Sequence, residues 1–199
     1  MMDGFLNRAL QCFVRDIYGA DQWDAVVSTA HLGFSEFEAM LTYDPSISER
    51  VITALEVVLN KPRIAVYEDL GTYLVSHEHM EAVRRLLRFG GEDFEEFLMS
   101  LDELPDRARL ALAEFDLPSI QVQAPGFRIY ILSFGAGLPG FLPIMMGVLR
   151  AMADDYGALV FMEYAQSEPK DQIVVTLADS RFSDGRDFEL APYKLVQNG

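Results

Sequence analysis

The feature that most constrains this chain is a change in its hydrophobic period near Asp116. Through roughly residue 113, apolar residues recur at three- and four-residue spacing, as on one face of a helix. Beyond Asp116 they alternate with polar residues, as in strands, apart from one further helical stretch. With 199 residues the chain is long enough for one sizeable core. We therefore expect a single domain over residues 1–199, with helices first and a sheet second.

The first part of the chain predicts a series of helices. Asp3 can cap a helix that Gly19 stops, and a second short helix follows around Trp23. Breaks at Asp-Pro, Lys-Pro and His-Glu-His separate the later helical stretches. These stretches are expected at residues 34–41, 48–59, 64–74 and 80–89.

The stretch from Glu92 to Leu104 carries the most informative apolar stripe. Its members are Phe94, Phe97, Leu98, Leu101 and Leu104. Eleven residues make about three helical turns, so Pro105 lies almost below Phe94 and is expected to face inward near the helix end. This helix should contribute strongly to the core.

The second part of the chain predicts two hairpins on either side of a helix. Ile120 and Val122 alternate with glutamines, and after a turn at Pro125-Gly126 the apolar Phe127, Ile129 and Ile131 alternate with Arg128, Tyr130 and Leu132. A helix is expected from Phe141 to Tyr156, and strands at 159–164 and 172–177 flank a turn at 167–170.

This order predicts an α+β fold. A helical half, about residues 1–116, should pack on an antiparallel four-stranded sheet with one long helix, about residues 117–191. The short tail, residues 192–199, offers little to bury and is expected to be loosely attached.

Charge and apolar runs exclude several classes of partner. The net charge of -15 repels phosphate backbones and anionic lipids, so neither nucleic acid nor a membrane surface is expected. The basic cluster at 84–88 is interpreted as a solvated helix face. The longest apolar run, 141–149, is about half the length of a membrane span. The single Cys12 and the absence of a signal-peptide pattern favour a cytoplasmic protein, whose oligomeric state stays open.

No catalytic motif or metal motif is found by spacing. His31, His77 and His79 are interpreted as solvated loop histidines rather than ligands, because no cysteine follows at metal spacing. Cys12 is expected to be a buried small apolar residue. The carboxylates at 93–96 fit a helix start, and the glycine-rich loop at 135–140 lacks the Lys and Ser or Thr of a phosphate-binding loop. We expect no enzyme and no metal site.

Three strings in order carry a family resemblance. The first runs from Gly4-Phe5-Leu6-Asn7-Arg8-Ala9-Leu10 through Tyr18-Gly19 to Trp23-Asp24. The second joins Asp69-Leu70-Gly71-Thr72-Tyr73, Leu86-Leu87-Arg88-Phe89-Gly90 and Phe97-Leu98-Met99-Ser100-Leu101-Asp102-Glu103-Leu104. The third is Leu117-Pro118-Ser119, then Gly137-Leu138 and a long apolar helix. Over nearly its whole length the chain resembles the haem-nitric-oxide/oxygen-binding (H-NOX) domain of bacterial gas sensors and soluble guanylyl cyclases.

The resemblance implies a ligand pocket and two departures from the family. Where the family has the histidine that binds haem iron, this chain has Pro105, which offers no lone pair to a metal. The family's Tyr-x-Ser-x-Arg motif matches Ile131 to Gly135, where only Ser133 is retained. The pocket residues implied by the resemblance are Leu6, Leu101, Pro105, Pro118, Ile131, Ser133 and Met145.

Two hypotheses about function follow. In the first, haem or another flat apolar molecule binds between the two halves and biases a partner protein. The resemblance implies a second-messenger synthase or a kinase as that partner. In the second, the chain is a haem-free interaction module in which Ile131, Phe134 and Met145 fill the old cavity.

Overall fold

A computed structural model describes residues 3–111, 117–165 and 171–186 of the chain. Its elements are α1 (Asp3–Tyr18), α2 (Ala20–Thr29), α3 (Pro45–Leu59), α4 (Arg63–Ser76), η1 (Glu78–Met80), α5 (Glu81–Arg88), α6 (Phe94–Met99), η2 (Leu101–Glu103), α7 (Leu104–Ala111), β1 (Ile120–Gly126), β2 (Ile129–Phe134), α8 (Phe141–Tyr156), β3 (Leu159–Tyr164) and β4 (Gln172–Asp179). The predicted α+β class is confirmed. The expected tail at 192–199 and the turn at 167–170 lie outside the described residues. Within the described residues no helix is both long and apolar enough to cross a membrane.

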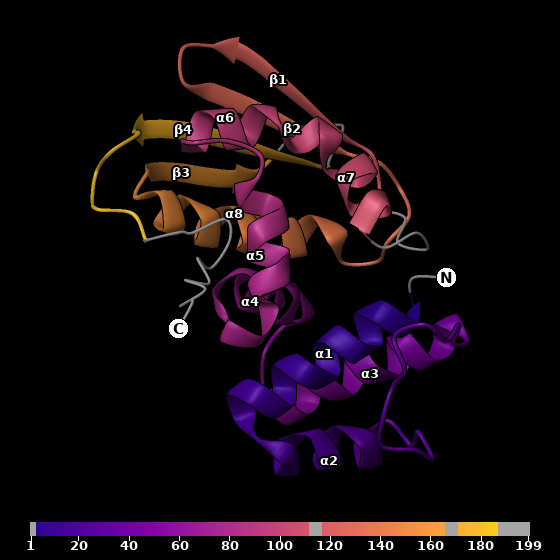
Figure 1. The fold of residues 1–199 in the computed structure, drawn as a ribbon. Coiled ribbons are helices and arrows are strands. Elements are labelled where there is room, and N and C mark those ends of the chain that lie inside the picture. Colours follow the sequence, from indigo (N-terminus) through magenta and orange to yellow (C-terminus); the bar gives the residue numbers. More distant parts are fainter. Residues whose placement is uncertain (1–2, 112–116, 166–170, 187–199) are drawn as a thin grey trace, which may run out of the picture.

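The strands form one sheet in the order β1-β2-β4-β3, with every neighbouring pair antiparallel. Figure 1 shows α8 lying along this sheet, with α4 between α8 and the group of α1, α2 and α3. Buried residues of β2 and β4, among them Leu132 and Ile173, are paired across the sheet and belong to the same core as α8. The predicted order of strand, strand, helix, strand, strand is therefore confirmed.

The inward face of β2 differs from the predicted one. Tyr130, Leu132 and Phe134 are buried, whereas the Phe127 side chain is 88% exposed. The turn falls at Phe127 and Arg128, two residues later than expected, and Arg128 adopts a positive φ of 58°. Both faces of this strand are apolar in sequence, so alternation alone could not choose between them. Pairing with β1 decides the face, because the buried Ile120 lies opposite Phe134.

The segment from 92 to 104 is not one continuous helix. Helix α6 ends at Met99, a short 3-10 turn follows, and α7 begins at Leu104, with Pro105 as its buried second residue. Proline is tolerated in the first turn of a helix, but in a helix interior its ring clashes with the carbonyl group four residues earlier. Pro105 therefore starts a new helix instead of ending the old one. The predicted core role of the stripe is confirmed, since its members are at most 4% exposed.

The helix expected at 34–41 does not form. These residues run as turns and irregular backbone after α2. Side chains from other helices satisfy the polar backbone groups, because Gln11 Oε1 accepts from the Phe37 amide at 2.8 Å and Trp23 Nε1 donates to the Ser35 carbonyl at 2.7 Å. The apolar spacing that predicted a helix instead buries Phe37 between helices α1 and α2 and the loop itself.

The arginines of α5 are not a solvated face. Asp155, which is fully buried at the end of α8, accepts from Arg84 Nη2 at 2.6 Å and lies 3.6 Å from Arg88 Nε. Arg88 also stacks over the Tyr156 ring at 4.0 Å. Only Arg85, which pairs with Glu81 one turn earlier, fits the predicted exposed role. The network ties α5 to α8 through charges that are 71 residues apart in sequence.

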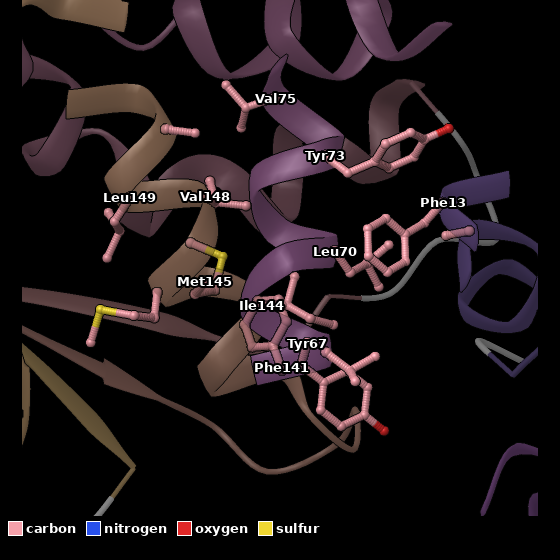
Figure 2. Packing of buried hydrophobic residues seen from close by; sticks show 14 of the residues in the cluster. Phe13, Tyr67, Leu70, Tyr73, Val75, Phe141, Ile144, Met145, Val148 and Leu149 are labelled. Carbon is pink, nitrogen blue, oxygen red and sulfur yellow. The ribbon is translucent and has the colours of Figure 1, made fainter. Parts of the chain in front are cut away.

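Helices α4 and α8 cross at close range. A Cβ atom at Gly147 would collide with the Glu68 carbonyl oxygen, and one at Gly71 would collide with the Ile144 carbonyl oxygen. Glycine at both positions therefore lets the two backbones touch. The side chains on either side of the crossing, including Leu70 and Val148, meet in the interior (Figure 2).

Candidate functional site

A cavity of about 140 Å³ lies where the helical half meets α8. Helices α1, α4, α5, α7 and α8 and the segments that carry Leu117 and Leu138 supply its walls. The lining residues are Phe5, Leu6, Ala9, Leu70, Leu74, Val83, Leu86, Leu87, Leu104, Ala108, Leu117, Leu138, Phe141, Ile144, Met145 and Val148. Leu70 of α4 lines the cavity together with Ile144, Met145 and Val148 of α8.

Helical periodicity places most of the lining side chains. Leu70 and Leu74 are one turn apart on α4, and Ile144 and Val148 are one turn apart on α8. Helix α8 can begin at Phe141 because Gly140 adopts a positive φ of 77° and lies against the Tyr67 ring, where a Cβ atom would collide. Phe141 then enters the wall and packs edge to face on Phe134.

The chemistry of the cavity is that of a hydrocarbon surface. All sixteen lining residues that the structure describes are apolar, and none of them supplies a general acid, a general base or a charge. Such a space binds by shape and dispersion and excludes polar ligands, which would lose their hydrogen bonds to water. Among the lining residues that the structure describes, the Met145 thioether is the one side chain with an atom that binds metals.

The residues expected for the pocket divide between four places. Leu6 and Met145 line the cavity. Leu101 is fully buried in the core beside η2 but is not among the lining residues. Pro105 and Pro118 line a separate hollow that also exposes Asp102, Asp106 and Arg109.

Ile131 and Ser133 lie on the other face of β2 from the buried side chains. Both are half-buried, and the Ser133 hydroxyl accepts from Gln172 Nε2 at 2.7 Å. Ile131 is therefore not among the residues that line the cavity. The buried neighbour Phe134 instead packs against the lining residue Phe141, and Met145 lines the cavity itself.

Met99, Tyr130, His77 and His79, whose side chains could bind iron, do not line the cavity. Met99 is 48% exposed, and the Tyr130 hydroxyl donates to Glu95 Oε2 at 2.5 Å. His77 and His79 lie beside Asp16 instead, at the far end of α1 from Leu6.

Most of the cavity wall was missed by sequence reasoning. Leu104 and Ala108 of α7 stand where Pro105 was expected, because the chain bends at η2 and turns α7 relative to α6. The pair Leu70 and Leu74 carried a signal, since apolar residues four apart share a helix face. That signal marks a buried face without saying which buried faces surround a cavity.

Comparison with known proteins agrees with the fold and its order of elements. The sequence profile of the family described as HNOB, haem-NO-binding, matches residues 3–164. The chain is similar to the soluble guanylate cyclase gcy-35 of Caenorhabditis elegans, with 27% identity over 156 residues that cover 76% of this chain and 22% of the relative. It is also similar to the soluble guanylate cyclase 89Da of Drosophila melanogaster, with 20% identity over 98% of this chain and 29% of the relative. The chain thus spans less than a third of the length of these cyclases.

Solved structures share the fold at low sequence identity. An H-NOX protein from S. oneidensis in the Fe(II) ligation state superposes with a TM-score of 0.72 at 16% identity, covering 91% of this chain and 98% of that one. An oxygen-binding H-NOX domain related to soluble guanylate cyclases gives a TM-score of 0.68 at 13% identity, covering 94% of this chain and 100% of that one. Domains of this family are haem-based sensors of nitric oxide and oxygen, and the domains themselves are not catalytic. The profile match covers well over half of the residues, and this chain therefore belongs to the haem-NO-binding family.

Proposed function

We propose that this chain is a non-enzymatic sensor domain whose cavity takes a small apolar ligand, and that occupancy regulates a partner protein. The observation that carries the proposal is the cavity of about 140 Å³, whose described lining residues, from five helices and two connecting segments, are all apolar. A dry apolar cavity of about 150 Å³ is large enough for benzene or xenon. The ligand class is therefore a compact apolar molecule or a gas.

Haem held through an iron bond fits these residues poorly. Pockets for cofactor-sized ligands run from about 300 to 1,000 Å³, well above the volume here. By the family resemblance the axial position is Pro105, which borders a different hollow and carries no lone pair. Ser133, the retained member of the family's Tyr-x-Ser-x-Arg motif, accepts a hydrogen bond from Gln172 on the other face of the sheet. We infer that the chain keeps the sensor fold without a histidine-ligated haem.

The position of the cavity suggests how occupancy reaches a partner. Its walls come from α1 and α4 in the helical half and from α8 on the sheet. A ligand that fits one relative arrangement of these helices better than another shifts the population towards it. The partner class, a second-messenger synthase or a kinase, rests on the family, whose relatives include proteins named as soluble guanylate cyclases.

The absence of iron-ligated haem is tested by spectroscopy. Purified protein is supplemented with haem, passed through a desalting column, and its absorbance spectrum recorded in the reduced state with and without nitric oxide. We expect no histidine-ligated spectrum. A tight five-coordinate haem with a histidine signature would overturn this part of the proposal and return gas sensing by haem to first place.

Ligand uptake is tested separately with xenon and benzene as probes. Saturation with either should raise the melting temperature and shift methyl NMR signals of the cavity residues, Met145 and Leu104 among them. Ala108→Leu and Ala9→Leu, which extend the wall from α7 and α1, should abolish both responses. Ala20→Leu, on the exposed start of α2, is the matched control. Lack of any response in the unmodified chain would favour the ligand-free interaction module instead.

A further inference from the structure

Two histidines and one carboxylate gather at the end of α1 that lies away from the cavity. Asp16 stands two residues before the end of α1, His77 is the residue after α4, and His79 is in the middle of η1. The backbone of His77 is extended, with φ -83° and ψ 139°, and it turns the chain sharply between the two helices. This turn brings two imidazoles, separated by one residue, towards a side chain more than sixty positions earlier.

The distances among these groups are those of metal ligands. Asp16 Oδ2 lies 3.7 Å from His77 Nδ1 and 3.3 Å from His79 Nδ1, and one ligand atom from each residue falls within 4.8 Å of the others. Zinc bonds to imidazole nitrogen and carboxylate oxygen are about 2.0 to 2.2 Å long, which separates two tetrahedral ligands by about 3.4 Å. The two Asp16 distances are close to that separation, and the two histidine nitrogens would have to approach each other by at most about 1.4 Å.

From this geometry we propose that Asp16, His77 and His79 form a transition-metal site, with Zn²⁺ as the ion that its chemistry favours. Imidazole nitrogen suits zinc and its neighbours in the first transition row, and a carboxylate supplies the negative charge that offsets part of the ion's. Three protein ligands leave one tetrahedral position for water. The net charge of -15 further favours cations over anions near the surface.

The surroundings supply the outer support that metal ligands usually have. The Tyr73 hydroxyl donates to Asp16 Oδ2 at 2.6 Å, and the Tyr73 ring lies 4.8 Å from the His77 ring. Figure 2 shows Tyr73 projecting from α4 on the side of Phe13, whose ring it contacts. Such outer partners orient ligands before the ion arrives.

The site is partly exposed, so an ion can enter it, and partly buried, so its ligands are held in place. The side chain of His79 is 64% exposed, whereas the side chains of His77 and Asp16 are 21% and 24% exposed. A hollow lined by His77, Tyr73 and residues of α1 opens beside the ligands and gives an entry path. His77 Nδ1 now accepts a long hydrogen bond of 3.4 Å from the His79 amide, which is weak and readily exchanged for a metal bond.

An ion at this position would join α1 to the junction of α4 and η1. These segments are otherwise connected here by Asp16 hydrogen bonds and by the contact of Phe13 with Tyr73. The inference does not depend on the cavity, because none of the three ligands lines it.

The site is tested with zinc itself on the full chain after dialysis against EDTA. Calorimetric titration should give one Zn²⁺ per chain, and Co²⁺ should produce the visible absorption bands of a tetrahedral site. Each of His77→Asn, His79→Asn and Asp16→Asn should weaken binding by more than the roughly 10- to 100-fold that loss of an outer partner costs. Tyr73→Phe should weaken it within that range while keeping the stoichiometry.

The control is His31→Asn, which removes the one histidine outside the cluster. His31 is exposed and adopts a positive φ of 49°, which asparagine tolerates well, so zinc binding should be unchanged. Far-UV circular dichroism in EDTA checks that each variant is folded. If His77→Asn fails to fold, His79→Asn decides, because its side chain lies mostly in solvent. Absent binding, or binding that survives loss of His79, would overturn the proposal.

Discussion

The buried carboxylate of Asp155 offers the sharpest test of the interior electrostatics. Its side chain is fully buried, and the guanidinium groups of Arg84 and Arg88 face it at 2.6 Å and 3.6 Å. The substitution Asp155→Asn keeps the shape of the side chain and removes its charge. No cavity is created, so the change in stability reports the loss of charge pairing.

The expected loss of unfolding free energy follows from the charge pairing that Arg84 and Arg88 lose. Removing one partner of a buried ion pair costs about 3 to 5 kcal/mol, because an uncompensated charge stays buried. Arg84 and Arg88 keep 20% and 15% of their side-chain surface, so water recovers part of that cost. We expect about 2 to 3 kcal/mol of lost unfolding free energy, at the lower edge of the buried range. With a urea slope of about 2 kcal/mol/M, the midpoint should fall by roughly 1 to 1.5 M.

Urea unfolding followed by circular dichroism measures this shift, and the slope should stay constant. The matched control is Asp154→Asn, because the neighbouring Asp154 is exposed and its loss changes the net charge identically. The control should alter stability by less than about 0.5 kcal/mol. The reasoning is refuted if Asp155→Asn costs no more than the control does.

Three further predictions concern the core, the haem position and alkaline pH. Leu101→Ala should lower the free energy of unfolding by about 2 to 5 kcal/mol in urea, because Leu101 is fully buried. The control Leu110→Ala, at an 89% exposed residue, should change that free energy little. A loss under about 0.5 kcal/mol for Leu101→Ala would contradict the burial of Leu101. Pro105→His should not increase haem retention in the absorbance assay, because Pro105 lies outside the cavity lining; a new histidine-ligated spectrum would show that the pocket extends to it. Burial raises the pKa of Tyr156 to about 12, and its hydroxyl donates to the Gly91 carbonyl oxygen at 2.8 Å. The folded state therefore favours the neutral phenol, and this contribution to stability is complete below the unfolded pKa of about 10 and lost as pH rises towards 12. From about pH 9 to about pH 11 the free energy of unfolding should fall less in Tyr156→Phe than in the unmodified chain. Equal falls in the two proteins would contradict this prediction.

Local signals predicted the elements that depend on local physics. Helix α8 and strand β3 have the predicted bounds, because a helical stripe bounded by glycines and a short apolar run bounded by turns leave few alternatives. Asp44 caps α3 through the Ser46 amide, as an aspartate before a proline favours. The helix predicted at 34–41 does not form, because the same apolar spacing also fits a loop in which Gln11 accepts a hydrogen bond from the Phe37 amide.

The sequence by itself determined the class of fold, the order of its elements, the family and the apolar character of the interior. Periodicity, capping and turn residues act between neighbours along the chain, so one sequence suffices to read them. Tertiary structure alone decided which face of β2 turns inward, which helix faces surround the cavity and that Asp16 meets His77 and His79. Each of these depends on how two distant segments are aligned. Strand register and the glycine crossing of α4 and α8 set that alignment through contacts between residues far apart in the chain.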